Sequence, residues 1–186
     1  LARNDAGDRW MQAAIQSSLA EDAGKVFSVL ARDSGSRSGA NGDFLRRLAT
    51  QISAQNRTAD ITRAIEAMGH FSEHDAVSVL PVLGEFLKGR RRAGSILAKM
   101  SADGQLQSLD DSVDKMIRST MKLATSNEAS VWQRIAAVES LSFGSFDTVA
   151  PTLVQLIDNR QAHELQRAAI STLGTFNHAG VTAPLL

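Results

Sequence analysis

Gln133-Arg-Ile-Ala-Ala-Val-Glu-Ser-Leu141 and Gln166-Arg-Ala-Ala-Ile-Ser-Thr-Leu173 share the core pattern Ala-Ala-aliphatic-polar-polar-Leu at an offset of 32 residues. Apolar residues recur in each segment at spacings of three and four, the pattern of an amphipathic helix. Each segment is followed by a turn that contains phenylalanine and then by a second apolar stripe, which opens at Val149 or at Val181. The sequence therefore predicts an internal repeat of helix pairs.

The same pattern extends towards the N-terminus. Arg63-Ala-Ile-Glu-Ala-Met-Gly69 matches the first helix of a pair, and its turn at Phe71 leads to a second apolar stripe. All three prolines fall at equivalent places, early in the second helix of a pair, where a missing N–H is tolerated best: Pro81, Pro151 and Pro184. Helical spacing covers nearly the whole chain without sustained apolar–polar alternation, so we expect an all-α fold.

Local signals predict helix ends and packing anchors. Asp110, Asn127 and Asp147 are expected to cap helix N-termini. Trp10 and Trp132 are expected to pack into the seams between helices. The glycine- and serine-rich segment 33–43 is expected to be a mobile loop.

The repeat resembles HEAT repeats. The segments Arg134–Leu141 and Leu165–Gly174 are similar to the first helix of that family, and Val149–Ile157 is similar to its second helix. The resemblance implies a right-handed α-α superhelix, an armadillo-like solenoid of about five helix pairs that spans residues 1–186 as a single domain. The stretch 89–125 matches the pattern weakly, and we expect irregular repeats there.

A closer resemblance involves Asp8–Leu19, Val26–Leu30 and Phe44–Ala49. These segments are similar to the HEAT segment of planctomycete-type exported membrane-bound dehydrogenase-like proteins, between a sorbosone-dehydrogenase-like β-propeller and a c-type haem domain. The resemblance implies a spacer within a periplasmic or exported redox protein; without it, a cytoplasmic location is expected. The chain opens without Met and stops within an apolar pattern, as expected for a piece of a longer protein.

Composition excludes several classes of function. Twenty Lys and Arg balance twenty Asp and Glu, so no overall charge attracts nucleic acid or anionic membranes. The absence of cysteine excludes thiolate catalysis, Cys-ligated metal and covalent c-type haem in these residues. No apolar run approaches the length of a membrane span, about 18 residues. We expect no membrane insertion by this segment, no bound cofactor and no enzymatic activity.

One motif resembles a metal site. His70-Phe-Ser-Glu-His74 spells H-x-x-E-H, which binds zinc when both imidazoles and the carboxylate share one helix face. Gly69 and Ser72 instead place the motif across a turn between helices. We therefore expect a solvated turn and no metal site.

The expected partner surface combines charged and polar residues of second helices with a basic cluster. These residues are Glu85, Lys88, Arg90, Arg91, Arg92, Gln155 and Asp158. The main hypothesis is a non-catalytic scaffold that binds a protein or neighbouring domains of the same chain. The alternative is a nucleic-acid-binding solenoid, of the HEAT-type DNA glycosylase class, that uses Arg90 to Arg92 on phosphates. The neutral chain and the lack of interleaved aromatic residues make nucleic acid the less favoured partner.

Overall fold

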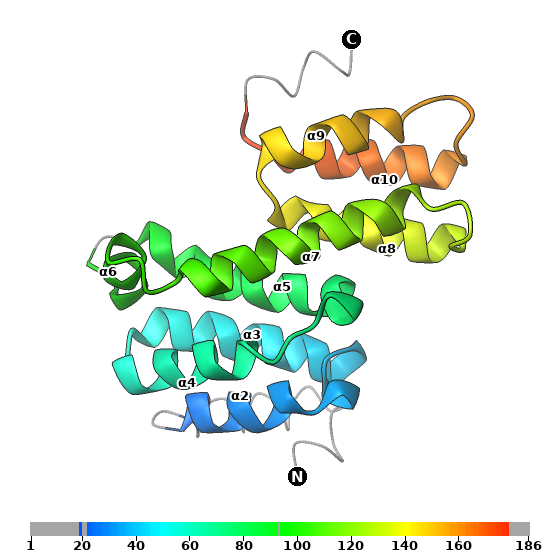
Figure 1. Cartoon of the computed structure of the whole chain (residues 1–186). Helices are drawn as coiled ribbons and strands as arrows, with labels where there is room; N and C mark the ends of the chain where they lie inside the picture. Colours follow the sequence, from blue (N-terminus) through cyan, green and yellow to red (C-terminus); the bar gives the residue numbers. More distant parts are fainter. Residues whose placement is uncertain (1–18, 20–21, 93, 179–186) are drawn as a thin grey trace. The chain divides into compact units, whose positions relative to one another are not determined.

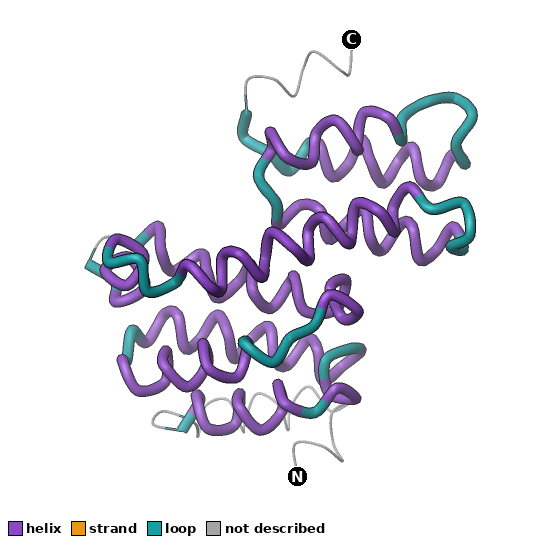
Figure 2. Tube along the Cα trace, in the orientation of Figure 1, coloured by secondary structure: helices purple, strands orange, loops and turns teal. Residues whose placement is uncertain are grey.

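A computed structural model describes residues 19, 22–92 and 94–178. In these ranges the chain forms nine α-helices and no strand, which confirms the all-α prediction (Figures 1 and 2). The helices are α2 (Ala23–Arg32), α3 (Gly39–Gln55), α4 (Thr58–Met68), α5 (Ala76–Leu87), α6 (Ile96–Ala102), α7 (Gln107–Thr125), α8 (Val131–Ser140), α9 (Phe146–Gln155) and α10 (His163–Leu173). Short 3-10 helices are η1 (Ser34–Ser36), η2 (Glu73–Asp75), η3 (Lys88–Arg91) and η4 (Leu141–Phe143).

The chain divides into two compact units, Leu1–Val113 and Asp114–Leu186, here called the N-terminal and C-terminal units. α7 runs across the division. Each unit has its own apolar core. The fully buried side chains include Phe27, Leu45, Leu48, Ile52, Ile61, Leu80 and Leu83 in the N-terminal unit, and Val138, Leu141, Leu153, Leu165 and Leu173 in the C-terminal unit. The continuity of one repeat array over residues 1–186 stays a prediction.

Helices that are next but one in the chain pack along each other. In the N-terminal unit α2 lies against α4 and α3 lies against α5, so that the four helices form two rows (Figure 1). In the C-terminal unit α8 lies against α10, and α9 also contacts α10. The helices predicted from the repeated segments are therefore present, and α8 and α10 are neighbours.

Two of the three prolines occupy the same place in their helices. Pro81 is the sixth residue of α5, and Pro151 is the sixth residue of α9. The equivalence predicted for these two residues is confirmed, while Pro184 lies outside the described residues.

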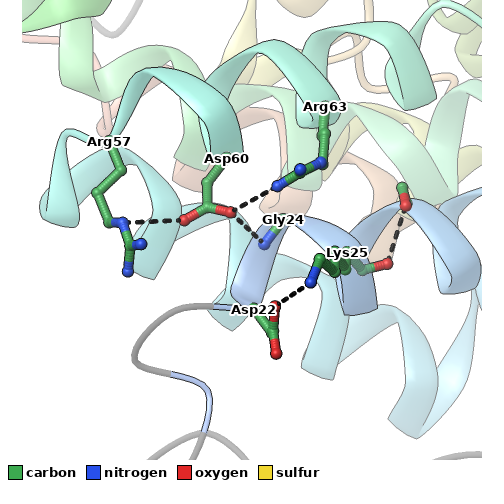
Figure 3. A network of polar contacts seen from close by, with 7 residues as sticks. Asp22, Gly24, Lys25, Arg57, Asp60 and Arg63 are labelled. Atoms are coloured by element: carbon green, nitrogen blue, oxygen red, sulfur yellow. Dashed lines mark hydrogen bonds and ion pairs between the residues drawn. The ribbon is translucent and has the colours of Figure 1, made fainter.

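A buried carboxylate ties α2 to α4 (Figure 3). Asp60, in the first turn of α4, is 1% exposed, and its Oδ1 accepts a hydrogen bond of 3.2 Å from the backbone N–H of Gly24 in α2. Arg57 and Arg63 place guanidinium nitrogens 3.6 and 3.7 Å from the same carboxylate. A Cβ on Gly24 would lie 2.7 Å from the Cα of Asp60, so the helices approach this closely only because residue 24 is glycine.

The segment 33–43 is more ordered than its composition predicts. It contains η1, and α3 already begins at Gly39, whose φ of +58° suits glycine. The buried side chain of Arg37 donates from Nε to the carbonyl of Ala31 (2.8 Å) and pairs through NH1 with Asp75 (2.5 Å). The prediction of a loop over this whole segment was wrong, because contacts with residues outside the segment hold it in place.

Trp132 does not pack into a seam. Its side chain is 76% exposed in the first turn of α8. It precedes the buried Ala137 by five residues, about 140° around the helix, so it points away from the core. The seam assignment of Trp132 was wrong, and Trp10 lies outside the described residues.

The stretch 89–125 contains a seven-residue helix, α6, followed by a nineteen-residue helix, α7. These are the shortest and the longest α-helices in the described part of the chain. The two lengths differ far more than those of the paired helices on either side.

Candidate partner-binding surface

The C-terminal end of α5 brings two of the predicted residues together. Lys88 Nζ lies 2.7 Å from Glu85 Oε1, and Thr50 of α3 donates to the other oxygen of Glu85 at 3.5 Å. The Lys88 side chain is 61% exposed, whereas that of Glu85 is 23% exposed. The Lys88–Glu85 pair is electrically neutral, and its carboxylate also links α5 to α3.

Arg90 is also neutralised within the protein. Its NH2 group forms a hydrogen-bonded ion pair with Asp110, in the first turn of α7. Its Nε is buried without a hydrogen-bond partner. The charge of Arg90 is thus already neutralised by Asp110 and contributes little to binding a partner.

Arg91 and Arg92 remain available. Both are exposed, and Arg92 NH1 donates to the carbonyl of Ala54 at the end of α3 (3.0 Å). Within the described ranges, the side chain of Arg91 has no hydrogen-bond or ion-pair partner. We call Glu85, Lys88, Arg90, Arg91 and Arg92 the basic surface; two of its four cations have no carboxylate partner among the described residues.

The backbone beneath the basic surface is fixed by close packing. A Cβ on Gly89 would lie 2.2 Å from Ser53 Oγ, so η3 rests directly on α3 at this glycine. Ser95 Oγ donates to the carbonyl of Gly89 (2.8 Å), and the N–H of Ile96 donates to Asn56 Oδ1 (2.7 Å). The two exposed guanidinium groups are therefore carried on a backbone held from both sides.

Gln155 and Asp158 belong to the C-terminal unit, whereas the basic surface belongs to the N-terminal unit. Gln155 is the exposed last residue of α9, and Asp158 follows in the next turn. Both carboxylate oxygens of Asp158 accept from Arg160, at 3.0 and 2.9 Å. Hydrogen bonds from the Arg160 side chain and then from its backbone lower the pKa of Asp158 to about 2. Five of the seven predicted residues therefore lie in one unit and two in the other.

A shallow hollow of about 170 Å³ lies at the opposite end of the α3–α5 pair. Its lining includes Arg37 and Ser38, which directly precede α3, Arg46 of α3, and Ser78 and Pro81 of α5. Arg46 pairs with Asp43 (3.1 Å), another lining residue. Sequence reasoning missed this hollow because it treated Arg37 and Ser38 as parts of a loop. An isolated arginine inside a glycine- and serine-rich segment was the available signal.

The H-x-x-E-H motif lies across a turn, as predicted. α4 ends at Met68 and η2 begins at Glu73, and His70, Glu73 and His74 are all exposed. Among the described residues, no group of three or more His, Asp or Glu side chains could hold a metal ion. In the same part of the chain, no helix is long and apolar enough to cross a membrane.

No family model, curated protein or solved structure matches this chain.

Proposed function

We propose that this chain is a non-catalytic scaffold of the HEAT type that binds an acidic segment of a partner protein, or of a neighbouring domain, at the basic surface. The observation that carries the proposal is the pair Arg91 and Arg92, exposed and without a carboxylate partner among the described residues, on a fixed backbone. Arginine on a held backbone suits carboxylate recognition, because little conformational freedom is lost when each hydrogen bond forms.

The packing of the helices supports the scaffold part of the proposal. Contacts between helices that are next but one in the chain occur in both units, and in the C-terminal unit they join α8 and α10, the two helices related by the 32-residue repeat. Stacked helix pairs of this kind present a long surface built from the second helices, which is how solenoid proteins bind partners. The basic surface lies on such a second helix, α5, and on η3 directly after it.

Nucleic-acid binding is supported less well by the same contacts. Lys88 and Arg90 are paired with Glu85 and Asp110, so half of the basic cluster is neutralised before any phosphate approaches. Affinity for nucleic acid grows with the number of phosphates that free cations neutralise. Two cations would give weak binding with a shallow salt dependence.

The test is binding of a labelled oligoglutamate peptide to the whole chain, followed by fluorescence anisotropy. The double substitution Arg91→Glu and Arg92→Glu is expected to lower the affinity about tenfold or more. The matched control is Lys115→Glu with Arg118→Glu, which changes the net charge equally at exposed positions of α7. Equal losses in the two variants would mean that only overall charge matters, and the proposed surface would be wrong. A labelled DNA duplex that binds more tightly than the peptide would favour the nucleic-acid hypothesis instead.

Within a longer protein, we further propose that this segment is a spacer between domains of an exported, haem-containing dehydrogenase-like protein. The support is the resemblance of Asp8–Leu19 and Phe44–Ala49 to that class. Sequencing the gene on both sides of the segment tests this directly. A β-propeller upstream and a Cys-x-x-Cys-His motif downstream are expected, whereas a start codon just before Leu1 and a stop codon just after Leu186 would contradict it.

A further inference from the structure

We propose that the outer face of α10, formed by Arg167, Ile170 and Gly174, is a docking face for one more helix pair of the same 32-residue repeat. This inference rests on the stacking of helix pairs in the proposed function. It concerns the C-terminal unit, so it is independent of the basic surface in the N-terminal unit.

Equivalent polar contacts support the alignment of α8 with α10 at an offset of 32 residues. Arg134 of α8 donates from Nε to the carbonyl of Ala124, near the end of α7 (2.9 Å). Gln166 of α10 donates from Nε2 to the carbonyl of Asp158, just after α9 (2.9 Å). Each long side chain thus reaches back to the end of the preceding helix. The core positions agree in the same register, since both members of each pair are buried: Ala137 and Ala169, Ser140 and Thr172, Leu141 and Leu173.

One face breaks this agreement. Ile135 of α8 and Ser142 of η4, which follows α8 directly, are half-buried, and Val138 between them is fully buried. These positions are spaced by three and four residues and so share one side of the helix. Their counterparts are all exposed: Arg167 and Ile170 of α10, the latter 42% exposed, and Gly174 at its C-terminal cap. Because the three buried pairs named above match, we attribute the difference to a cover that α8 has and that the described residues do not give to α10.

The helix that follows α8 in its row is α10 itself, which packs along it. The corresponding occupant of the face on α10 is therefore the next first helix of the same type, with small residues at its contact as α10 has at Ala169. A single exposed isoleucine is common on protein surfaces, so exposure alone carries no weight. Ile170 differs from such residues because its counterpart Val138 is fully buried.

The experiment adds one repeat in register. Residues 179–186 stand 32 residues after 147–154, so a copy of residues 155–178 appended after Leu186 continues the period. The chain contains no cysteine, which makes Ile170→Cys a unique probe of burial in both the original and the extended chain. Val131→Cys is the matched control, because Val131 is 38% exposed and lies at the start of α8.

The proposal predicts that maleimide reacts with the thiol of the Ile170→Cys variant roughly tenfold or more slowly in the extended chain, because a buried thiol reacts only after local opening. The thiol of the Val131→Cys variant should react equally in both chains. Equal rates for the Ile170→Cys variant in the two chains, or added residues that give no helical circular dichroism signal, would overturn the proposal. A dimer of the original chain that Ile170→Asp abolishes would place a second copy on the face and would also overturn it. Oligoglutamate binding is measured in parallel for the original and the extended chain. Binding that persists while the Ile170→Cys rates stay equal would mean that the docking face is wrong but the proposed function is not.

Discussion

The α2–α4 contact and the α8–α10 contact join helices in the same arrangement but with different polar groups. In the N-terminal unit, the backbone N–H of Gly24 at the start of α2 is bound by Asp60, which lies on α4, 36 residues later. In the C-terminal unit, α8 is capped locally: Ser130 and Gln133 form a reciprocal capping box at its start. Helix α2 therefore depends on its neighbour for its cap, whereas α8 does not.

The two kinds of cap predict different effects when a capping side chain is removed. A cap supplied by another helix couples the stability of the two helices, because loss of the capping side chain exposes a buried N–H at a distance. A local capping box confines the same loss to one helix end. The two units therefore combine similar apolar packing with different polar coupling.

The largest effects are expected from the apolar contacts that the repeat makes equivalent. Leu141→Ala and Leu173→Ala remove fully buried side chains at matching positions and are expected to lower the free energy of unfolding by about 2–5 kcal/mol each. Urea unfolding of each variant measures this. Losses under about 1 kcal/mol in both would contradict the repeat alignment, because a buried leucine rarely costs so little.

Asp60→Ala tests the cap that crosses between helices. The substitution removes a buried, charged hydrogen-bond acceptor from the N–H of Gly24, and we expect a loss of about 1.5–3 kcal/mol. Asp43→Ala is the matched control, since Asp43 is exposed and pairs with Arg46 on its own helix. Its expected cost is under about 0.5 kcal/mol. Urea unfolding measures both losses. Similar losses of unfolding free energy in the Asp60→Ala and Asp43→Ala variants would mean that the cap from Asp60 contributes no more than an exposed ion pair.

Ser130→Ala tests the local cap of α8. Its hydroxyl accepts from the N–H of Gln133, so the expected loss is about 1 kcal/mol. Ser112→Ala, in the exposed part of α7, is a suitable control because its hydroxyl donates to the carbonyl of Ser108 within the same helix. Thermal unfolding of the two variants should differ, and equal midpoints would mean that the capping box contributes nothing.

The smallest effect concerns the exposed Asp158–Arg160 pair. In the folded protein the pKa of Asp158 lies at about 2, below its ordinary value of 3.8. A lowered folded pKa stabilises the fold above the ordinary value, and that contribution is lost as the pH falls through the folded value. We expect Arg160→Ala to raise the pKa of Asp158 towards 3.8 in an NMR titration, with little change in stability because the pair is exposed. A midpoint that stays near 2 would contradict the assignment of Arg160 as the cause.

The sequence predicted the helices well, because amphipathic stripes depend on local spacing alone. It placed some helix starts wrongly. α8 and α9 are capped by Ser130 and Ser145 rather than by Asn127 and Asp147. Asp110 lies inside the first turn of α7, not before it. Serine and aspartate both cap helices, so two candidates within one turn are not separated by residue type.

The sequence indicated which charged residues form the candidate site, but not which of them form ion pairs within the protein. The cluster Lys88 to Arg92 was visible as a run of charge, yet the neutralisation of Arg90 by Asp110 was not, because the partners are 20 residues apart. The bond between Asp60 and Gly24 spans 36 residues and depends on how α2 and α4 are aligned. Contacts of this kind follow from helix packing, which the local sequence does not specify.

Hydrogen exchange of the Asp60→Ala variant tests most directly whether α2 depends on a residue of α4 for its cap while α8 is capped locally. Although the substitution lies in α4, the amides at the start of α2 are expected to exchange about tenfold faster. The Ser130→Ala variant should change only amides of α8. Faster exchange confined to α4 in the Asp60→Ala variant, with α2 unchanged, would contradict the coupling between neighbouring helices.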